Sequence, residues 1–273
     1  MKSVLITGCS SGIGRCIADG LKRRNYNVIV TARKQDDINK LEAVGFDVID
    51  LDLANSKSIH AAVETLLSKT DGELYGLVNN AAYGQTGAVE DLTTEALREQ
   101  FETNVFGTQE LTNLIIPVMR KQNEGRIIQI SSVLGFITMK FRGAYCASKY
   151  ALEALSDAMR YELDGTGIKV SLIEPGPIKS EFRNNAFASY QRVVDKNNSQ
   201  HAAAYAKVEK EMNEEKSSIP FTLEPEAVLK KVIHALESEN PKARYFVTFP
   251  TYLFSVLKRI LPGNLLDKVL IKI

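Results

Sequence analysis

The chain has 273 residues, of which 44% are hydrophobic and 25% are charged, and this composition excludes fibrous, collagen-like and disordered proteins. The 34 Lys and Arg residues nearly balance the 33 Asp and Glu residues, which argues against a nucleic-acid binder that neutralises many phosphates. Three scattered cysteines argue against a disulfide framework, and no apolar run approaches the ~20 residues of a membrane-spanning helix. We therefore expect one large cytoplasmic domain.

Short apolar runs rich in Val and Ile recur along the chain without alternating with polar residues, which is typical of strands covered on both faces. Amphipathic segments at 56–69 and 94–120 are long enough to be crossover helices. This alternation predicts an α/β fold of Rossmann type, in which a doubly wound parallel sheet of about seven strands has helices on both faces. The expected strands are 4–6, 28–30, 46–49, 74–78, 126–130, 169–173 and 245–249.

A glycine-rich turn directly follows the first expected strand and opens an amphipathic helix. Glycines let a backbone approach a pyrophosphate closely, and the N-terminus of the helix offers N–H groups and the positive end of its dipole. The spacing is Gly-x-x-x-Gly-x-Gly, not the Gly-x-Gly-x-x-Gly of the general dinucleotide motif. We expect this turn to bind a dinucleotide through Gly8, Ser10, Ser11, Gly12, Ile13 and Gly14.

The residues after the next strands bear on the choice of dinucleotide. The second strand ends in Ala32 and Arg33, with no acid to bond ribose hydroxyls, and a guanidinium at this place suits the 2′-phosphate of NADP(H). Asp52, followed by Leu53, is either a partner for the adenine amino group or a cap of its own loop. Amides after the fourth strand are expected to join neighbouring loops around the cofactor, in the segment Asn80, Ala81 and Ala82.

A second cluster of chemical groups follows the fifth strand. Ser132 ends that strand, and Tyr145 and Lys149 follow it four residues apart, which places these two on one face of a helix. A neighbouring ammonium favours the phenolate, so Lys149 is expected to lower the pKa of Tyr145 toward neutral pH. His60, His201 and His234 are scattered along the chain, and no metal site is expected.

In order and spacing, residues 3–180 resemble the short-chain dehydrogenase/reductases. One glycine motif would be weak evidence, whereas the ordered set is specific. The branch with the greatest likeness is that of the bacterial NADP-dependent aldehyde reductases, with hydroxysteroid and retinol dehydrogenases as alternatives. The motifs that carry the resemblance are Thr7-Gly-x-x-x-Gly-x-Gly14, Asn79-Asn80-Ala81, Asn104, Ser132, Tyr145-x-x-x-Lys149 and Pro175-Gly176.

The resemblance implies a role for each matching residue. Tyr145 would protonate the carbonyl oxygen during reduction, Ser132 would polarise that oxygen, and Lys149 would hold the ribose of the nicotinamide. Asn104 would anchor a water through which Lys149 exchanges protons with solvent. The segment Pro175, Gly176, Ile178 and Ser180 would line the nicotinamide. Two departures from the family pattern are Ala82 in place of the usual glycine and Ser180 where the family often has Thr.

The segment 177–222 contains no expected strand and is interpreted as a substrate lid, with a disordered linker as the alternative and a helix expected at 202–212. Few charges stand near the chemical centre in the sequence, which favours an apolar aldehyde or ketone as substrate. Apolar residues near the chemical centre are expected to shape the pocket, with core packing as the alternative that accounts for several of them; they are Val133, Leu134, Phe136, Met139, Phe141, Phe182 and Phe187.

The end of the chain is basic and apolar. From residue 241 onward, six basic residues face one acidic residue, and Pro262-Gly263 divides the tail 250–273 into two expected helices. Such a tail either packs over the substrate mouth or a second subunit, or makes a weak contact with a membrane surface. The resemblance implies a homodimer or homotetramer, formed through the helix after Asn104 and the helix that contains Tyr145.

These features define the expected organisation and activity. We expect one domain, with a cofactor and catalytic core at 1–176, the lid at 177–222, a closing helix and strand at 223–249, and the tail. The expected activity is NADPH-dependent reduction of an apolar carbonyl compound. A protein that binds NADP without redox chemistry is the alternative from another class, but such a protein would have lost Tyr145 or Lys149.

Overall fold

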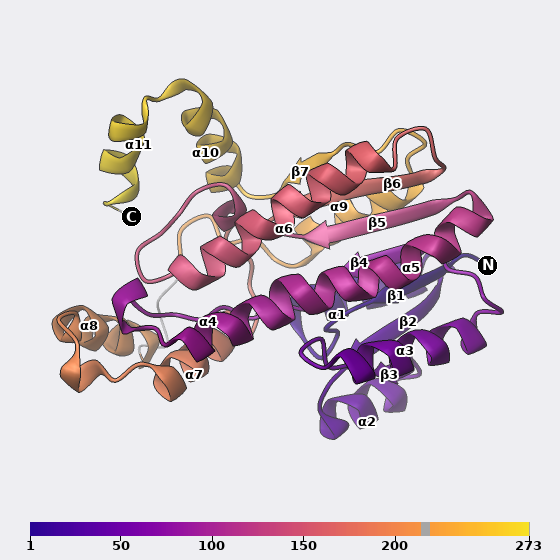
Figure 1. Ribbon diagram of the computed structural model, residues 1–273, viewed down its shortest axis with the longest axis horizontal. Coiled ribbons are helices and arrows are strands. Elements are labelled where there is room, and N and C mark those ends of the chain that lie inside the picture. The colour runs from indigo at the N-terminus through magenta and orange to yellow at the C-terminus, as the bar shows by residue number, and fades with distance from the viewer. Residues whose placement is uncertain (214–218, 273) are drawn as a thin grey trace.

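The computed structural model describes residues 1–213 and 219–272 and shows a central sheet between two layers of helices (Figure 1). The sheet has the order β3-β2-β1-β4-β5-β6-β7, and each neighbouring pair is parallel. The predicted doubly wound α/β fold is therefore confirmed. The strands are β1 Ser3–Ile6, β2 Asn27–Ala32, β3 Asp47–Asp50, β4 Gly76–Asn79, β5 Gly125–Ile130, β6 Ile168–Glu174 and β7 Arg244–Phe246.

The helices follow the strands in the expected rhythm. Segment 56–69 is one helix, whereas 94–120 is two helices joined by a π-helical turn, Glu102–Gly107. The helices are α1 Gly12–Lys22, α2 Gln35–Ala43, α3 Ser56–Lys69, α4 Thr94–Phe101, α5 Thr108–Gln122, α6 Gly143–Glu162, α7 Phe182–Val193, α8 Ala202–Asn213, α9 Glu226–Glu237, α10 Phe249–Ile260 and α11 Gly263–Leu270.

Alternate residues of each strand enter opposite cores, as the period of two in a strand requires. In β1, Val4 and Ile6 pack with residues of α1, α2 and α9, whereas Leu5 packs with residues of α3, α5 and α6. Both faces of the sheet are therefore covered, which explains why the strands are apolar throughout. Strand β1 lies between β2 and β4, and this reversal of strand order opens a crevice at the carboxyl ends.

The last strand is shorter than predicted, because a helix begins where the strand was expected to continue. Segment 245–249 was expected as a strand, but β7 ends at Phe246 and α10 begins at Phe249 with Pro250 in its first turn. Proline lacks an N–H group and has a φ angle suited to the start of a helix, so it favours helix over ladder pairing here.

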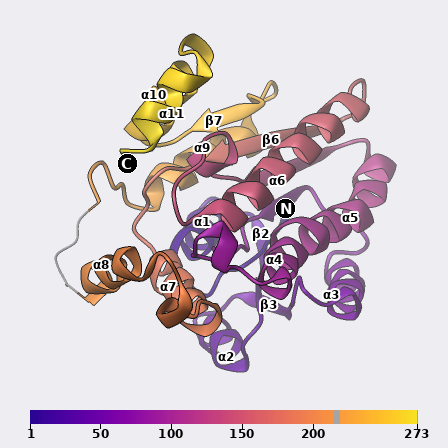
Figure 2. The same cartoon turned by 60° about the vertical axis from the view of Figure 1, so that its left-hand side comes forward.

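The predicted lid and tail lie at the carboxyl end of the sheet (Figures 1 and 2). The helix expected at 202–212 lies within α8, and Tyr205 of α8 fixes it: its hydroxyl donates to Asp91 Oδ2 at 2.5 Å and accepts from the Ala88 N–H at 2.7 Å. Helices α7 and α8 lie in this stretch, and its role as a substrate lid stays a prediction. Residues 214–218 of the lid and residue 273 of the tail lie outside the described residues.

The tail forms two helices separated at Pro262, as predicted. Phe254 of α10 is buried against Leu134 and Tyr145, and Lys258 Nζ donates to the Phe136 carbonyl oxygen at 2.6 Å. The tail therefore packs over the chemical end of the crevice. Within residues 1–213 and 219–272, no helix is long and apolar enough to cross a membrane.

Candidate active site

A cleft of about 2320 Å³ lies over the carboxyl ends of the strands and brings together most of the residues singled out in the sequence. Gly14 and Asn104 are the two that do not line it. The predicted site residues that do are Gly8, Ser10, Ser11, Gly12, Ile13, Arg33, Asp52, Leu53, Asn80, Ala81, Ala82, Ser132, Tyr145, Lys149, Pro175, Gly176, Ile178 and Ser180.

The glycine turn is shaped to bring backbone against the cleft. Gly8 and Gly12 have φ angles of +70° and +57°, in the region that favours glycine. A Cβ on Gly14 would lie 2.3 Å from the Gly8 carbonyl oxygen, so Gly14 lets helix α1 close onto the turn and supports the site from behind. Ser11 precedes α1, and its side chain does not cap the helix. The N–H groups of the first turn are therefore available to bind an anion. This cradle fits the pyrophosphate of a dinucleotide.

Asn80 and Thr7 join the loops after β1 and β4. Asn80 Nδ2 donates to the carbonyl oxygens of Thr7 and Gly8 at 2.9 and 3.0 Å, and Thr7 Oγ1 accepts from the backbone N–H groups of Asn80 and Ala81. Ala82, the departure from the family pattern, lies in the wall of the cleft without closing it. The predicted joining of loops by an amide is present.

Arg33 and Asp52 lie together at one rim of the cleft. Arg33 Nη1 is 3.9 Å from Asp52 Oδ1, and the Arg33 side chain is 63% exposed. Asp52 Oδ1 also accepts from the Ala54 N–H at 3.0 Å, so the carboxylate caps its own loop, as one of the two interpretations required. No acidic residue stands directly after β2. Arg33 and Lys34 follow that strand, and both line the cleft.

Ser132, Tyr145 and Lys149 form the floor of the cleft. Lys149 Nζ donates to the Ile130 carbonyl oxygen at 2.8 Å and lies 5.8 Å from the centroid of the Tyr145 ring. Burial lowers the pKa of Lys149 to about 8, against the opposing effect of the Glu153 carboxylate. An ammonium with such a pKa exchanges its proton near neutral pH.

The expected lowering of the Tyr145 pKa is wrong. Burial of the phenol raises the pKa of Tyr145, because the phenolate loses its hydration, and a hydrogen bond with Ser132 opposes this only in part. At neutral pH the side chain is therefore a protonated donor held beside Ser132. The sequence could place the ammonium near the phenol but could not weigh it against burial.

Asn104 is buried in the π-helical turn between α4 and α5, and turns of this kind are frequent at functional sites. Its Nδ2 donates to the Tyr83 carbonyl oxygen at 3.0 Å and to Ser148 Oγ at 3.1 Å, one residue before Lys149. Asn104 thus ties α5, α6 and the loop after β4 together behind the floor. Its contact with a water near Lys149 stays a prediction.

The apolar wall of the cleft contains only part of the set predicted for it. Val133, Leu134, Met139 and Phe182 line the cleft. Three predicted aromatics do not: Phe136 packs against Phe246, and Phe141 and Phe187 pack with the tyrosines of α7 and α8. Further apolar residues of the wall come from α10 and the segment before α9, within or next to the predicted tail and lid, and they are Ile219, Pro220, Phe221, Phe249, Pro250, Leu253 and Phe254.

The wall of the cleft also contains charges that the sequence analysis did not single out. Arg142, Arg183 and Arg192 all line the cleft, because the start of α6 and one face of α7 converge on it. Arg192 pairs with Glu99 of α4 at 3.2 Å. Sequence proximity to Ser132 and Tyr145 could not find these residues, since α7 approaches only in the folded chain.

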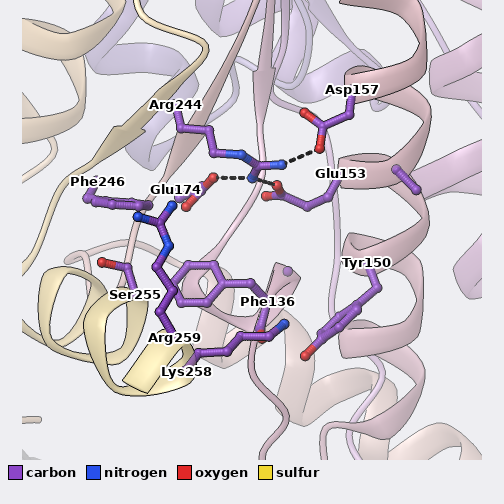
Figure 3. A pocket seen from close by; sticks show the side chains of 12 residues that line it. Phe136, Tyr150, Glu153, Asp157, Glu174, Arg244, Phe246, Ser255, Lys258 and Arg259 are labelled. Atoms are coloured by element: carbon purple, nitrogen blue, oxygen red, sulfur yellow. Dashed lines mark hydrogen bonds and ion pairs between the residues drawn. The ribbon is translucent and has the colours of Figure 1, made fainter. Parts of the chain in front are cut away.

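A smaller cavity of about 480 Å³ lies beside the cleft, between α6, the end of the sheet and α10 (Figure 3). There Arg244 of β7 pairs with Glu174 of β6 at 2.6 Å, with Asp157 of α6 at 2.6 Å, and with Glu153. Burial and the nearby Glu153 carboxylate raise the pKa of Glu174 to about 8. This cluster of four side chains joins β7 and the base of the tail to α6.

Comparisons with known proteins agree with this arrangement. The family model described as short chain dehydrogenase matches residues 2–191. The chain is 45% identical over 269 residues to the uncharacterized oxidoreductase YbbO of Escherichia coli K12, covering 98% of this chain and 94% of that protein. It is 34% identical over 282 residues to the NADPH-dependent 3-dehydrocapnine reductase of Ornithobacterium rhinotracheale, covering 100% and 97%.

Among solved structures, a short-chain dehydrogenase from Streptomyces avermitilis superposes with a TM-score of 0.75 at 28% identity, over 98% of this chain and 96% of that one. The sheet order, the glycine turn and the Ser-Tyr-Lys floor occur here in one chain whose first two thirds match the family model. The protein belongs to the short-chain dehydrogenase/reductase family, and it is an oxidoreductase that acts on alcohol or carbonyl groups.

Proposed function

We propose that this protein is an NADPH-dependent carbonyl reductase, of the aldehyde reductase branch, that converts an aldehyde or ketone with an apolar body into the alcohol, reversibly. The observation that carries the proposal is the buried Tyr145 beside Ser132 and Lys149 in a cleft that also contains the glycine turn. A buried acid at neutral pH is suited to the reductive direction, in which the carbonyl oxygen gains a proton.

Each residue of the floor has a distinct role in this proposal. The bound dinucleotide supplies the hydride for the carbonyl carbon. Tyr145 gives its hydroxyl proton to the carbonyl oxygen, while the Ser132 hydroxyl donates a hydrogen bond to the same oxygen and fixes its position. Lys149 holds the ribose hydroxyls and returns a proton to Tyr145, which suits an ammonium whose pKa is about 8. Asn104 anchors the water that replenishes this proton.

Replacement of Tyr145 by Phe tests the mechanism. We expect a loss of about 10²–10⁴-fold in kcat, the usual contribution of general acid catalysis, with little change in NADPH affinity. Oxidation of NADPH is followed with medium-chain aldehydes, retinal and steroid ketones, which also separates the aldehyde reductase branch from the retinol and hydroxysteroid alternatives. Tyr150→Phe, a tyrosine of the same helix that lines the smaller cavity, is the matched control. Equal turnover by wild type and Tyr145→Phe would refute the assignment, and tight NADPH binding without turnover of any compound would favour the non-redox alternative.

The preference for NADP(H) rests on Arg33. Its guanidinium stands at the rim of the cleft after β2, where no acid is present to bond ribose hydroxyls. The relative from Ornithobacterium is named as NADPH-dependent. We expect Arg33→Asp to weaken NADPH at least about tenfold and to favour NADH, since it replaces a phosphate-binding cation by an anion. Unchanged dissociation constants for both dinucleotides would mean that the 2′-phosphate is recognised elsewhere.

The assembly is part of the same proposal. Helices α5 and α6 would pair with those of a second copy in a homodimer or homotetramer, and α6 leaves Tyr150, Leu155 and Tyr161 exposed. The outer face of the tail also exposes apolar side chains beside Lys258 and Arg259, which is the basis for a weak membrane-surface contact. Light scattering of the purified protein measures the mass of the assembly, and sedimentation with anionic vesicles measures the tail contact.

A further inference from the structure

Arg142 is a cation in the wall of the cleft that has no carboxylate partner among residues 1–213 and 219–272. Its Nη1 donates to the hydroxyl of Thr86, a neutral acceptor. Arg192, which lines the same cleft, differs in both respects, because its side chain is 57% exposed and pairs with the Glu99 carboxylate. Of these two arginines, Arg142 is therefore the one without a carboxylate partner among the described residues.

This lack of a partner is energetically unfavourable. Burial lowers the pKa of the Arg142 guanidinium, and the nearby charge of Arg183 acts in the same direction. Arginine does not lose its proton under ordinary conditions, so the charge persists at the cost of its hydration. A partly buried cation is usually paired with an anion, because an unpaired one loses part of its hydration without compensation. An anion that enters the cleft would relieve this cost.

The position of Arg142 relates it directly to the reacting group. It precedes the first residue of α6, and its carbonyl oxygen accepts from the Cys146 N–H at 2.8 Å, so the helical hydrogen bonding already includes it. Tyr145 comes three residues later, in the first turn of the same helix. Arg142 and Tyr145 both line the cleft.

The surroundings of this wall limit what can bind there. The Phe182 ring lies 5.2 Å from the Tyr145 ring, and a Cβ on Gly84 would lie 2.7 Å from Phe182, so this side of Tyr145 is tightly enclosed. Leu134 and Phe254 pack in the same apolar cluster as Tyr145 and also line the cleft. A ligand that reaches both Tyr145 and Arg142 thus has an anionic end and an apolar end.

We infer that Arg142 binds an acid group of the substrate, so that the carbonyl compound is an oxo acid whose carboxylate lies a few bonds from the carbonyl and whose remaining chain is apolar. The inference rests on the proposed reductase function for the position of the carbonyl at Tyr145. It refines that function, because an apolar aldehyde or ketone without an acid group would leave Arg142 unpaired.

The test compares straight-chain oxo acids, with the carbonyl at positions 2 to 6, with their methyl esters. We expect the wild type to prefer at least one acid over its ester by about tenfold or more in kcat/KM, the range of a hydrogen bond between charged groups. Arg142→Gln is expected to lower kcat/KM for that acid by a similar factor, mainly through KM, and to change the ester by less than about threefold. Arg142→Lys should retain part of the preference, and Arg192→Gln, the matched control in the same cleft, should retain it in full.

A second measurement separates this inference from the reductase proposal. Octanoate, which cannot be reduced, is titrated into the NADP-loaded wild type and Arg142→Gln by calorimetry, with methyl octanoate as the neutral partner. Octanoate binding that is about tenfold weaker in Arg142→Gln supports the anion site even if no compound is turned over. Equal octanoate affinity in the two proteins overturns it, as does an equal loss of acid and ester turnover in Arg142→Gln.

Discussion

Replacement of Arg244 by Met removes the guanidinium that three carboxylates share at the base of the tail. The Glu174 side chain is fully buried and that of Glu153 is 8% exposed, so neither carboxylate can recover its hydration when the cation is lost. Methionine fills a similar volume without charge, so the change isolates the electrostatic contribution. The free energy of unfolding should therefore fall because two buried carboxylates lose their counter-ion.

The size of the effect follows from the burial of the cluster. Breaking a buried ion pair by removing one partner costs about 3–5 kcal/mol. For a chain of 273 residues, with an unfolding entropy of about 2.1 cal/mol/K per residue, this loss corresponds to a decrease in Tm of about 5–10 °C. Arg24→Met is the matched control, because Arg24 pairs with Glu237 at 2.7 Å on the surface, where such pairs contribute less than about 1 kcal/mol.

The loss should also depend on pH. Burial raises the pKa of Glu153 and of Glu174 above the ordinary value, so the folded protein binds protons that the unfolded chain releases, and stability falls as pH rises through these raised values. Arg244 offsets this fall by favouring the ionised carboxylates. At pH 5 the Glu174 carboxyl, whose pKa is about 8, is mostly protonated and needs no cation, so the cost of Arg244→Met should be at least about 1 kcal/mol smaller than at pH 8.

Thermal and urea unfolding of wild type, Arg244→Met and Arg24→Met at pH 5 and pH 8 measure these differences. A loss in Arg244→Met that is the same at both pH values would refute the electrostatic reasoning and leave only packing. A loss no larger than that of Arg24→Met would show that the cluster is worth no more than a surface pair.

Two further predictions concern the turn and the lid. Gly14→Ala places a methyl group 2.3 Å from the Gly8 carbonyl oxygen, so the turn must shift. We expect NADPH affinity to fall about tenfold in a fluorescence titration. In the control Gly263→Ala, the added methyl group has nothing within 4 Å, and NADPH affinity should change less than twofold. Equal affinities in both variants would contradict the role of Gly14. Tyr205→Phe removes the acceptor of a buried N–H group at Ala88. The free energy of unfolding, measured with urea, should fall by about 1–3 kcal/mol, and proteolysis within α8 should be faster. An unchanged urea midpoint would show that other contacts hold the lid.

The predictable part of the site is the part that lies at strand ends. Residues such as Gly8, Asn80 and Ser132 follow apolar strands, and a parallel sheet brings all its carboxyl ends to one edge. The order of these motifs along the sequence was therefore enough to predict that the residues lie together. Gly14 and Asn104 belong to the same set of motifs but do not line the cleft. A motif includes residues that support a site as well as residues that face it.

The sequence could not predict the rest for identifiable reasons. The protonation of Tyr145 depends on how completely the fold removes water from the phenol, a property of packing and not of spacing. Phe136, Phe141 and Phe187 have the composition of a pocket wall, but the packing of α7, α8 and α10 turned them toward other aromatic side chains.

By itself, the sequence determined the doubly wound sheet, the glycine turn and the Ser-Tyr-Lys floor, because these depend on local periodicity and on the common direction of parallel strands. Only the tertiary structure decided which charges line the cleft. Arg142 and Arg192 are 50 residues apart in the chain and differ in whether a carboxylate from another element reaches them. Such pairing depends on long-range packing. Among the described residues, Glu99 pairs with Arg192, whereas Arg142 lines the cleft without a carboxylate partner, as the proposed site for an acid group of the substrate requires.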